Sequence, residues 1–184
     1  MKKLAIVFTM VICVLFTRVT VAQEQKELPE SDDGVITGSA CETDPDNLVT
    51  NCGFEIPPAF SGWTRSGDQS FTYLASECRH SGVVGVCTGP IFNLGFISQL
   101  IGTEPGASYD LSFWLARQGA GGIGRFQVYW NGQIIYDRYE ENFSYQLWEF
   151  SGLIASGELT ELRFGFHSVI GYFWLDDVVI VSSP

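Results

Sequence analysis

The sequence predicts an all-β fold, an antiparallel β-sandwich, from three observations. Short segments alternate apolar and polar residues with a period of two, as strands with one buried face do. Turn signals built on Gly, Pro, Asn and Asp recur about every ten residues between these segments. No stretch shows the 3.6-residue apolar period of an amphipathic helix. Residues 47–182 are enough to bury one sandwich core.

The strand patterns also predict which side chains face the core. The predicted inward sets are Tyr109, Leu111, Phe113 and Leu115; then Phe126, Val128 and Trp130; then Leu162, Phe164 and Phe166. Residues 172–181 are predicted to form the terminal strand. Asn131-Gly132 predicts a two-residue hairpin turn, because both residues accept a positive φ. Pro105-Gly106 predicts a tight turn before a strand.

The first residues have the features of a secretory signal peptide. Lys2 and Lys3 precede an apolar run that is short for a membrane span, and small residues end the predicted segment 1–22. Residues 23–46 are acidic and polar, which predicts a flexible linker. Residues 47–182 are the predicted sandwich domain. We therefore expect a secreted, extracellular protein without membrane insertion.

The charge balance limits the partners. The whole chain has a formal charge of −11, from 10 basic and 21 acidic residues. Residues 1–22 hold three of the basic residues and none of the acidic ones, so removing them leaves −14. No basic patch remains that could neutralise phosphates, so we expect no nucleic-acid partner.

Four cysteines follow the predicted signal peptide: Cys41, Cys52, Cys78 and Cys87. An even number in an exported chain indicates disulfides, and four cysteines allow three pairings. The short loops favour the pairing of neighbours, Cys41 with Cys52 and Cys78 with Cys87. The alternative is a zinc site completed by a histidine, but the spacings do not match zinc motifs.

Four motifs in order resemble a known family. They are "NLVTNCGFE…FSGWT" from residue 47, "HSG" at 80–82, "ISQLIGTEPGASYDLSFWLA" at 97–116 and "LDDVVI" at 175–180. This order is similar to that of jelly-roll, galactose-binding-like carbohydrate-binding modules. The resemblance implies a jelly-roll sandwich that recognises a glycan without catalysis. One departure is Cys52, which stands where the family pattern has Gly.

The resemblance also implies a structural calcium ion. In the family, the "GFE" acid and an acid of the closing "DDV" strand converge on calcium, which implies Glu55 with Asp176 or Asp177, helped by Asn51 and its neighbours. Adjacent strand residues point to opposite faces, so one of the two aspartates faces inward, where a bare carboxylate is costly. Calcium accepts carboxylate and carbonyl oxygens. The alternative is that these acids accept hydrogen bonds from backbone amides without a metal.

A candidate ligand surface comes from the polar strand faces. Sugar rings bind flat aromatic side chains surrounded by hydrogen-bonding groups. If the polar faces of three strands line one concave sheet, they bring together Trp114, Gln127, Tyr129, Arg163 and His167, with Arg117 at the edge. The alternative is that Trp114 packs under a loop. A predicted polar loop carries a second candidate patch, formed by Tyr136, Tyr139, Tyr145 and Trp148.

Enzyme motifs are absent from the sequence. It has no G-x-S-x-G, H-E-x-x-H or P-loop pattern, and the glycine-rich residues 119–124 lead into a strand rather than a helix. We therefore predict no catalytic activity. The predicted function is non-catalytic recognition of a glycan. The alternative is a structural or adhesive extracellular matrix or surface protein that binds proteins or itself.

Overall fold

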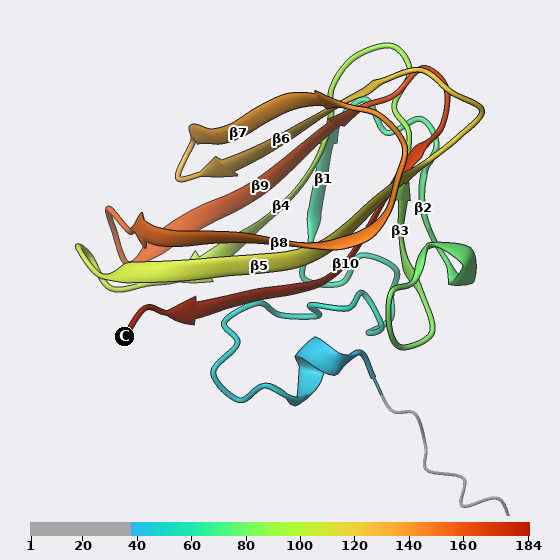
Figure 1. Ribbon diagram of the computed structural model, residues 1–184. Coiled ribbons are helices and arrows are strands. Elements are labelled where there is room, and N and C mark those ends of the chain that lie inside the picture. Colours follow the sequence, from blue (N-terminus) through green and yellow to red (C-terminus); the bar gives the residue numbers. More distant parts are fainter. Residues whose placement is uncertain (1–37) are drawn as a thin grey trace, which may run out of the picture. The chain divides into compact units, whose positions relative to one another are not determined.

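The computed structural model describes residues 38–184, which form two five-stranded antiparallel sheets (Figure 1). Sheet A has the order β1-β4-β9-β6-β7, and sheet B has the order β2-β3-β10-β5-β8. The bounds in sheet A are β1 Thr64–Gly67, β4 Gly95–Gly102, β9 Leu159–His167, β6 Gly124–Trp130 and β7 Gln133–Glu140. Those in sheet B are β2 Thr72–Ala75, β3 Gly85–Thr88, β10 Tyr172–Ser182, β5 Ser108–Gln118 and β8 Phe143–Ile154. The predicted antiparallel β-sandwich is confirmed.

The core lies between the two sheets and is formed by the faces that the alternation predicts. Leu111, Phe113 and Leu115 of β5 are at most 1% exposed. The Phe113 ring lies 4.9 Å from that of Phe164 in β9 and 5.8 Å from that of Phe126 in β6. Burying each such side chain contributes roughly 1.5–3 kcal/mol. Aromatic contacts between the sheets are therefore a main source of stability.

Both predicted turns are confirmed. Asn131 and Gly132 join β6 to β7 with φ values of 50° and 76°, a backbone conformation that Asn and Gly adopt most readily. Gly106 has φ 82° and precedes β5. The glycine-rich residues 119–123 form a loop between β5 and β6, as predicted.

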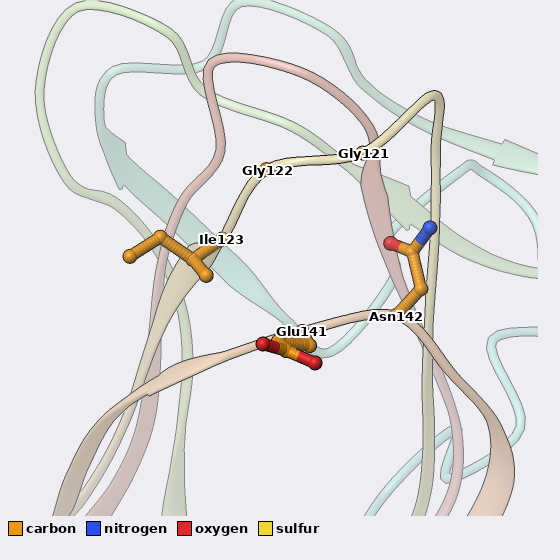
Figure 2. A pocket seen from close by; sticks show the side chains of 5 residues that line it. All are labelled: Gly121, Gly122, Ile123, Glu141 and Asn142. Carbon is orange, nitrogen blue, oxygen red and sulfur yellow. The ribbon is translucent and has the colours of Figure 1, made fainter.

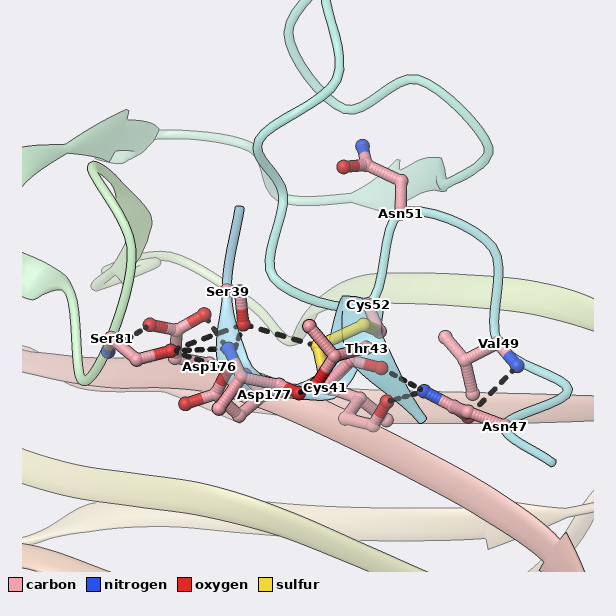
Figure 3. Close-up of a disulfide and its surroundings, with 12 residues drawn as sticks. Ser39, Cys41, Thr43, Asn47, Val49, Asn51, Cys52, Ser81, Asp176 and Asp177 are labelled. Carbon is pink, nitrogen blue, oxygen red and sulfur yellow. Dashed lines mark hydrogen bonds between the residues drawn. A yellow bond between two sulfur atoms is a disulfide. The ribbon is translucent and has the colours of Figure 1, made fainter. Parts of the chain in front are cut away.

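The segment before β1 is attached to the last strand. A disulfide joins Cys41, in the 3₁₀ helix η1 (Ala40–Thr43), to Cys52, and Figure 3 shows it beside β10. The amide of Leu48 donates to the Ile180 carbonyl over 2.9 Å. Residues 38–46, predicted as flexible linker, therefore belong to the folded domain, which is a correction. The disulfide attaches this segment to the domain, whereas its polar composition alone predicts a flexible linker.

The second disulfide joins Cys78 of η2 (Ser76–Cys78) to Cys87 of β3, so the predicted pairing of neighbours is confirmed. The predicted signal peptide at 1–22 and residues 23–37 of the linker lie outside the described residues. Within residues 38–184, no helix is both long enough and apolar enough to cross a membrane.

The predicted polar loop around residues 136–148 is wrong. β7 and β8 fill most of it, at the edges of different sheets, and only two residues connect them. The rings of Tyr136 and Trp148 meet edge to face at 5.0 Å and pack against the core. As edge strands, β7 and β8 contain many polar residues on their exposed faces, so their sequence resembles that of a loop.

Candidate functional site

The structure divides the predicted ligand surface between two sheets. Trp114 lies on β5 of sheet B, whereas Gln127 and Tyr129 lie on β6 and Arg163 and His167 on β9, both in sheet A. The single surface predicted from the sequence therefore does not form. Alternation shows which face of a strand turns outward, but it does not show the sheet, and the chain crosses from sheet B to sheet A between β5 and β6.

Arg117 does not lie at the edge of a ligand surface, because it is fully buried. Its guanidinium donates to four neutral acceptors: Gly122 O at 3.1 Å, Asn142 Oδ1 at 2.6 Å, Ser168 Oγ at 3.2 Å and Ile170 O at 3.1 Å. It also lies over the Phe173 ring, 5.6 Å from the centroid. Burial lowers the pKa of this guanidinium. Arg117 therefore holds three loops together at one end of the sandwich.

Four of the predicted residues lie together on the outer face of sheet A: Gln127, Tyr129, Arg163 and His167. Tyr129 and Arg163 are directly paired across β6 and β9, and the guanidinium carbon lies 4.2 Å from the Tyr129 ring centroid. The same guanidinium lies 5.1 Å from the centroid of Phe96 on β4. The Arg163 Nε–H group is buried and donates to no acceptor among the described residues. Arg163 thus contacts two aromatic rings that meet edge to face at 6.1 Å, and its other end lies 3.7 Å from a carboxylate oxygen of Glu161.

Gly165, which is buried, lets Phe96 and Gln127 pack closely against the sheet. A Cβ atom there would lie 3.0 Å from Phe96 Cε1 and 3.1 Å from Gln127 Oε1, tighter than ordinary contacts. Gln127 is 1% exposed, and its Oε1 accepts a 2.8 Å hydrogen bond from the Tyr129 hydroxyl. We name the set Phe96, Gln127, Tyr129, Arg163 and Gly165 the sheet A platform.

Polar groups continue the platform toward β7. Arg125 forms a two-bond ion pair with Asp137, with distances of 2.8 Å and 2.6 Å. Hydrogen bonding from Arg125 lowers the pKa of Asp137 to about 2, so this carboxylate is ionised at neutral pH. His167 is paired with Arg125 across β9 and β6. The platform therefore combines flat rings with charged groups that can bind hydroxyls.

Sequence reasoning missed Phe96, Arg125 and Asp137. Phe96 alternates with the buried Ile97, so its outward direction could have been predicted from the period of two. The pairing of Arg125 with Asp137 depends on the β6–β7 register across the hairpin turn. Phe96 lies near Arg163 because β4 pairs with β9, and no local sequence pattern predicts a pairing between strands so far apart in the chain.

The predicted metal ligands lie around the loop at residues 80–84. Glu55 Oε1 accepts from the amides of Val83 at 2.6 Å and Val84 at 3.0 Å. Asp176 Oδ2 accepts from the amides of His80 at 2.7 Å and Ser81 at 3.1 Å. The first and last parts of the domain are thus joined through one loop.

Asp177 and Asn51 have other partners. Asp177 has φ 49° at a bulge in β10 and binds His80 Nδ1 at 2.7 Å; Ser39 and Ser81 donate to its other oxygen (Figure 3). The Asn51 side chain binds Ile56 N at 2.8 Å and Ser61 O at 2.7 Å, so it holds its own loop.

These contacts bear on the fit to calcium in two ways. Burial, together with the charge of Asp177, raises the pKa of Asp176 to about 8, and a cation would relieve that cost. However, amide donors already occupy Glu55 Oε1 and both oxygens of Asp176. In residues 38–184 the predicted ligands form no group of three within 4.8 Å; Cys41, Glu42 and Cys52 do, but a disulfide joins those two cysteines. A ready-made cage for calcium is therefore not present in this arrangement.

A hollow at the loop end does not resemble a site for sugar stacking. It has a volume of about 350 Å³ and is lined by Gly121, Gly122, Ile123, Glu141 and Asn142 (Figure 2). Figure 2 shows Ile123 and Glu141 as its largest side chains, and no aromatic ring among the five. We therefore place the candidate site on the sheet A platform.

Comparisons with known proteins support the fold. No family model and no curated protein matches the sequence. Three similar solved structures have 11–18% sequence identity to this chain. TmCBM61 in complex with beta-1,4-galactotriose has 18% identity and a TM-score of 0.59, over 74% of this chain and 99% of that one. The CBM22-1 xylan-binding domain of Paenibacillus barcinonensis Xyn10C has 14% identity and a TM-score of 0.53, over 71% of this chain and 90% of that one. The C-terminal family 22 module of Clostridium thermocellum Xyn10B has 11% identity and a TM-score of 0.57, over 77% and 98%. The chain therefore has the jelly-roll β-sandwich fold found in carbohydrate-binding modules.

Proposed function

We propose that this protein is a secreted, non-catalytic module that binds carbohydrate on the sheet A platform. The observation that carries the proposal is the Arg163 guanidinium, which contacts the rings of both Tyr129 and Phe96 on an outward sheet face. Flat rings contact the apolar faces of sugars, and charged side chains bind their hydroxyls. The similar structures support this reading, since TmCBM61 is in complex with beta-1,4-galactotriose and the CBM22-1-GH10 modules of Clostridium thermocellum Xyn10B are complexed with xylohexaose.

The platform is also ordered before any ligand arrives. Tyr129 is 8% exposed and hydrogen-bonded to Gln127, and Arg163 is stacked, so few side-chain rotamers remain to be fixed on binding. Ordering costs about 0.5–1.5 kcal/mol for each flexible side chain, and a pre-ordered surface avoids most of this cost.

The test is a glycan array, followed by calorimetric titration with beta-1,4-galactotriose and xylohexaose. We expect binding by the wild type and its loss in Tyr129→Ala and Arg163→Ala. Tyr73→Ala is the matched control, because Tyr73 is 41% exposed on β2 of the other sheet. No glycan bound on the array, or equal binding by all variants, would reject the platform as the site.

The second candidate function is adhesion to a protein or to another copy. It is favoured by three exposed apolar side chains on two loops: Phe92 is 75% exposed, Val169 63% and Ile170 52%. The loops meet where the amide of Ser168 donates to Pro90 O over 2.8 Å. Self-association that rises with concentration and disappears in Val169→Asp, measured by light scattering, would favour this function.

Calcium remains a proposal, with Glu55 and Asp176 as its principal ligands. It is supported by the buried carboxylate of Asp176 and by the shared loop that both acids contact. Such an ion would stabilise the attachment of the first segment to β10, and we assign it no catalytic role. Asn51 is not included, because its side chain is occupied within its own loop.

A further inference from the structure

A second aromatic surface lies on the outer face of sheet B. Trp114 and Ser112 project from β5, Leu147 is paired with Trp114 from β8, and Val179 is paired with Ser112 from β10. Directly paired residues share a face, so these four side chains meet on one surface. They line a cleft of about 220 Å³ that also includes residues of η1.

The indole of Trp114 is held in place by the side chain of His80. The His80 ring stacks on it with centroids 3.8 Å apart and an interplanar angle of 12°. His80 is fixed in turn by Asp177, 2.7 Å from its Nδ1, and by Tyr145, whose ring is 5.2 Å away. The Trp114 ring is therefore oriented by a network that reaches β8 and β10, while remaining only partly buried.

The rest of the cleft provides the other groups that a sugar needs. Leu147 is 47% exposed and gives an apolar wall, and the Ser112 hydroxyl and Asp44 carboxylate give polar atoms. Pockets for drug-sized ligands measure roughly 300–1,000 Å³, so this smaller cleft fits one sugar ring rather than a length of chain.

We propose that the Trp114 cleft is a second carbohydrate-binding site, which takes a single pyranose ring stacked on the indole. This inference rests on the proposed function in supposing that the ligand is a glycan. The platform and the cleft lie on the outer faces of opposite sheets, so a short oligosaccharide cannot contact both. The module would bind two glycan chains at once and cross-link a polysaccharide.

The experiment is calorimetric titration of the full chain with xylohexaose and with beta-1,4-galactotriose. We expect two molecules bound per chain in the wild type and one in Trp114→Ala. Trp174→Ala is the matched control, since Trp174 is a half-buried tryptophan of the same sheet that does not line the cleft. It should keep both sites.

A second variant guards against unfolding of Trp114→Ala. Leu147→Arg puts a large charged side chain at the cleft from an exposed position on an edge strand, and circular dichroism should show an unchanged fold. The second site would be overturned if Leu147→Arg still bound two molecules per chain. It would also be overturned if the wild type bound one molecule and neither cleft variant changed the affinity.

The outcomes also separate the two proposals. Loss of all binding in Arg163→Ala, with no effect of the cleft variants, leaves the platform and removes the cleft. The reverse pattern leaves the cleft and removes the platform. If neither oligosaccharide binds the wild type, both sites are rejected as sites for these neutral sugars.

Discussion

The guanidinium of Arg163 lies 4.2 Å from the centroid of the Tyr129 ring, on a sheet face turned away from the core. The two residues face each other across β6 and β9, so the backbone pairing itself sets their contact. A cation–aromatic contact at a partly exposed site contributes roughly 0.5–1 kcal/mol. Its larger consequence is that a planar cation is held over an aromatic ring.

Replacing Arg163 by Lys should weaken glycan binding at least tenfold, roughly 1.4 kcal/mol. Lysine keeps the charge but loses the planar group that contacts both rings and offers several donors. The stability should change by less than about 0.5–1 kcal/mol, because the side chain is 29% exposed. Titration with the best ligand of the array measures the effect, and Arg138→Lys on exposed β7 is the control. Unchanged affinity would show that stacking is not used.

Replacing Arg117 by Ala should lower the free energy of unfolding by about 2–4 kcal/mol. The substitution leaves four acceptors without their donor and opens a cavity beside Phe173. Urea unfolding measures the change. The control is Arg125→Ala, where a partly exposed ion pair should contribute at most about 1 kcal/mol. Equal losses in both variants would mean that Arg117 does not organise the loops.

Calcium should raise the melting temperature if the proposed ion binds. A ligand at one hundred times its dissociation constant stabilises the folded state by about 2.7 kcal/mol. We expect a higher midpoint in calcium than in EGTA, and no difference in Asp176→Asn, which lacks the second carboxylate oxygen. Identical wild-type midpoints in calcium and EGTA would remove the calcium proposal.

Stability should fall in acid through Asp68. Its carboxylate accepts from the Ser70 hydroxyl and from the amides of Ser70, Phe92 and Asn93, which lowers its pKa far below the ordinary 3.8. A carboxylate with a lowered pKa stabilises the fold above its ordinary value and loses this effect as the pH falls further. Asp68→Asn should therefore lose less stability than the wild type between about pH 6 and about pH 3.

Urea midpoints of both proteins at the two pH values test this prediction. Asp110→Asn is a useful comparison, because hydrogen bonds from Ser183 also lower the pKa of Asp110, at the opposite end of β5 from the loop at 119–123. The pH-dependent loss should be reduced separately by each substitution. A wild-type loss that Asp68→Asn leaves unchanged would assign the acid sensitivity to other groups.

Much of the fold follows from local patterns. Phe113, Phe126 and Phe164 are buried as the alternation predicts, because a strand has two faces and burial selects the apolar one. The Asn131-Gly132 turn forms because its positive φ values suit these residues. The disulfide pairs follow the short spacings. Each of these features depends on residues close together in the chain.

The candidate site could be predicted only in part. The outward direction of Gln127, Tyr129 and Arg163 followed from the period of two, but their separation from Trp114 did not. The burial of Arg117 was also missed, because its neutral partners come from loops near residues 122, 142 and 168–170. A polar residue at a strand end has no local mark that distinguishes a surface group from a buried one.

The sequence by itself determined that this protein is a β-sandwich and which faces of its strands are buried. It also determined the position of the Asn131-Gly132 hairpin turn and the pairing of the cysteines. Only the tertiary structure decided that β5 pairs with β8 and β10 while β6 pairs with β7 and β9. That choice places Trp114 and Tyr129 on opposite sides of the molecule. The physical reason is that face direction is a property of one strand, whereas sheet membership depends on hydrogen bonds between segments far apart in sequence.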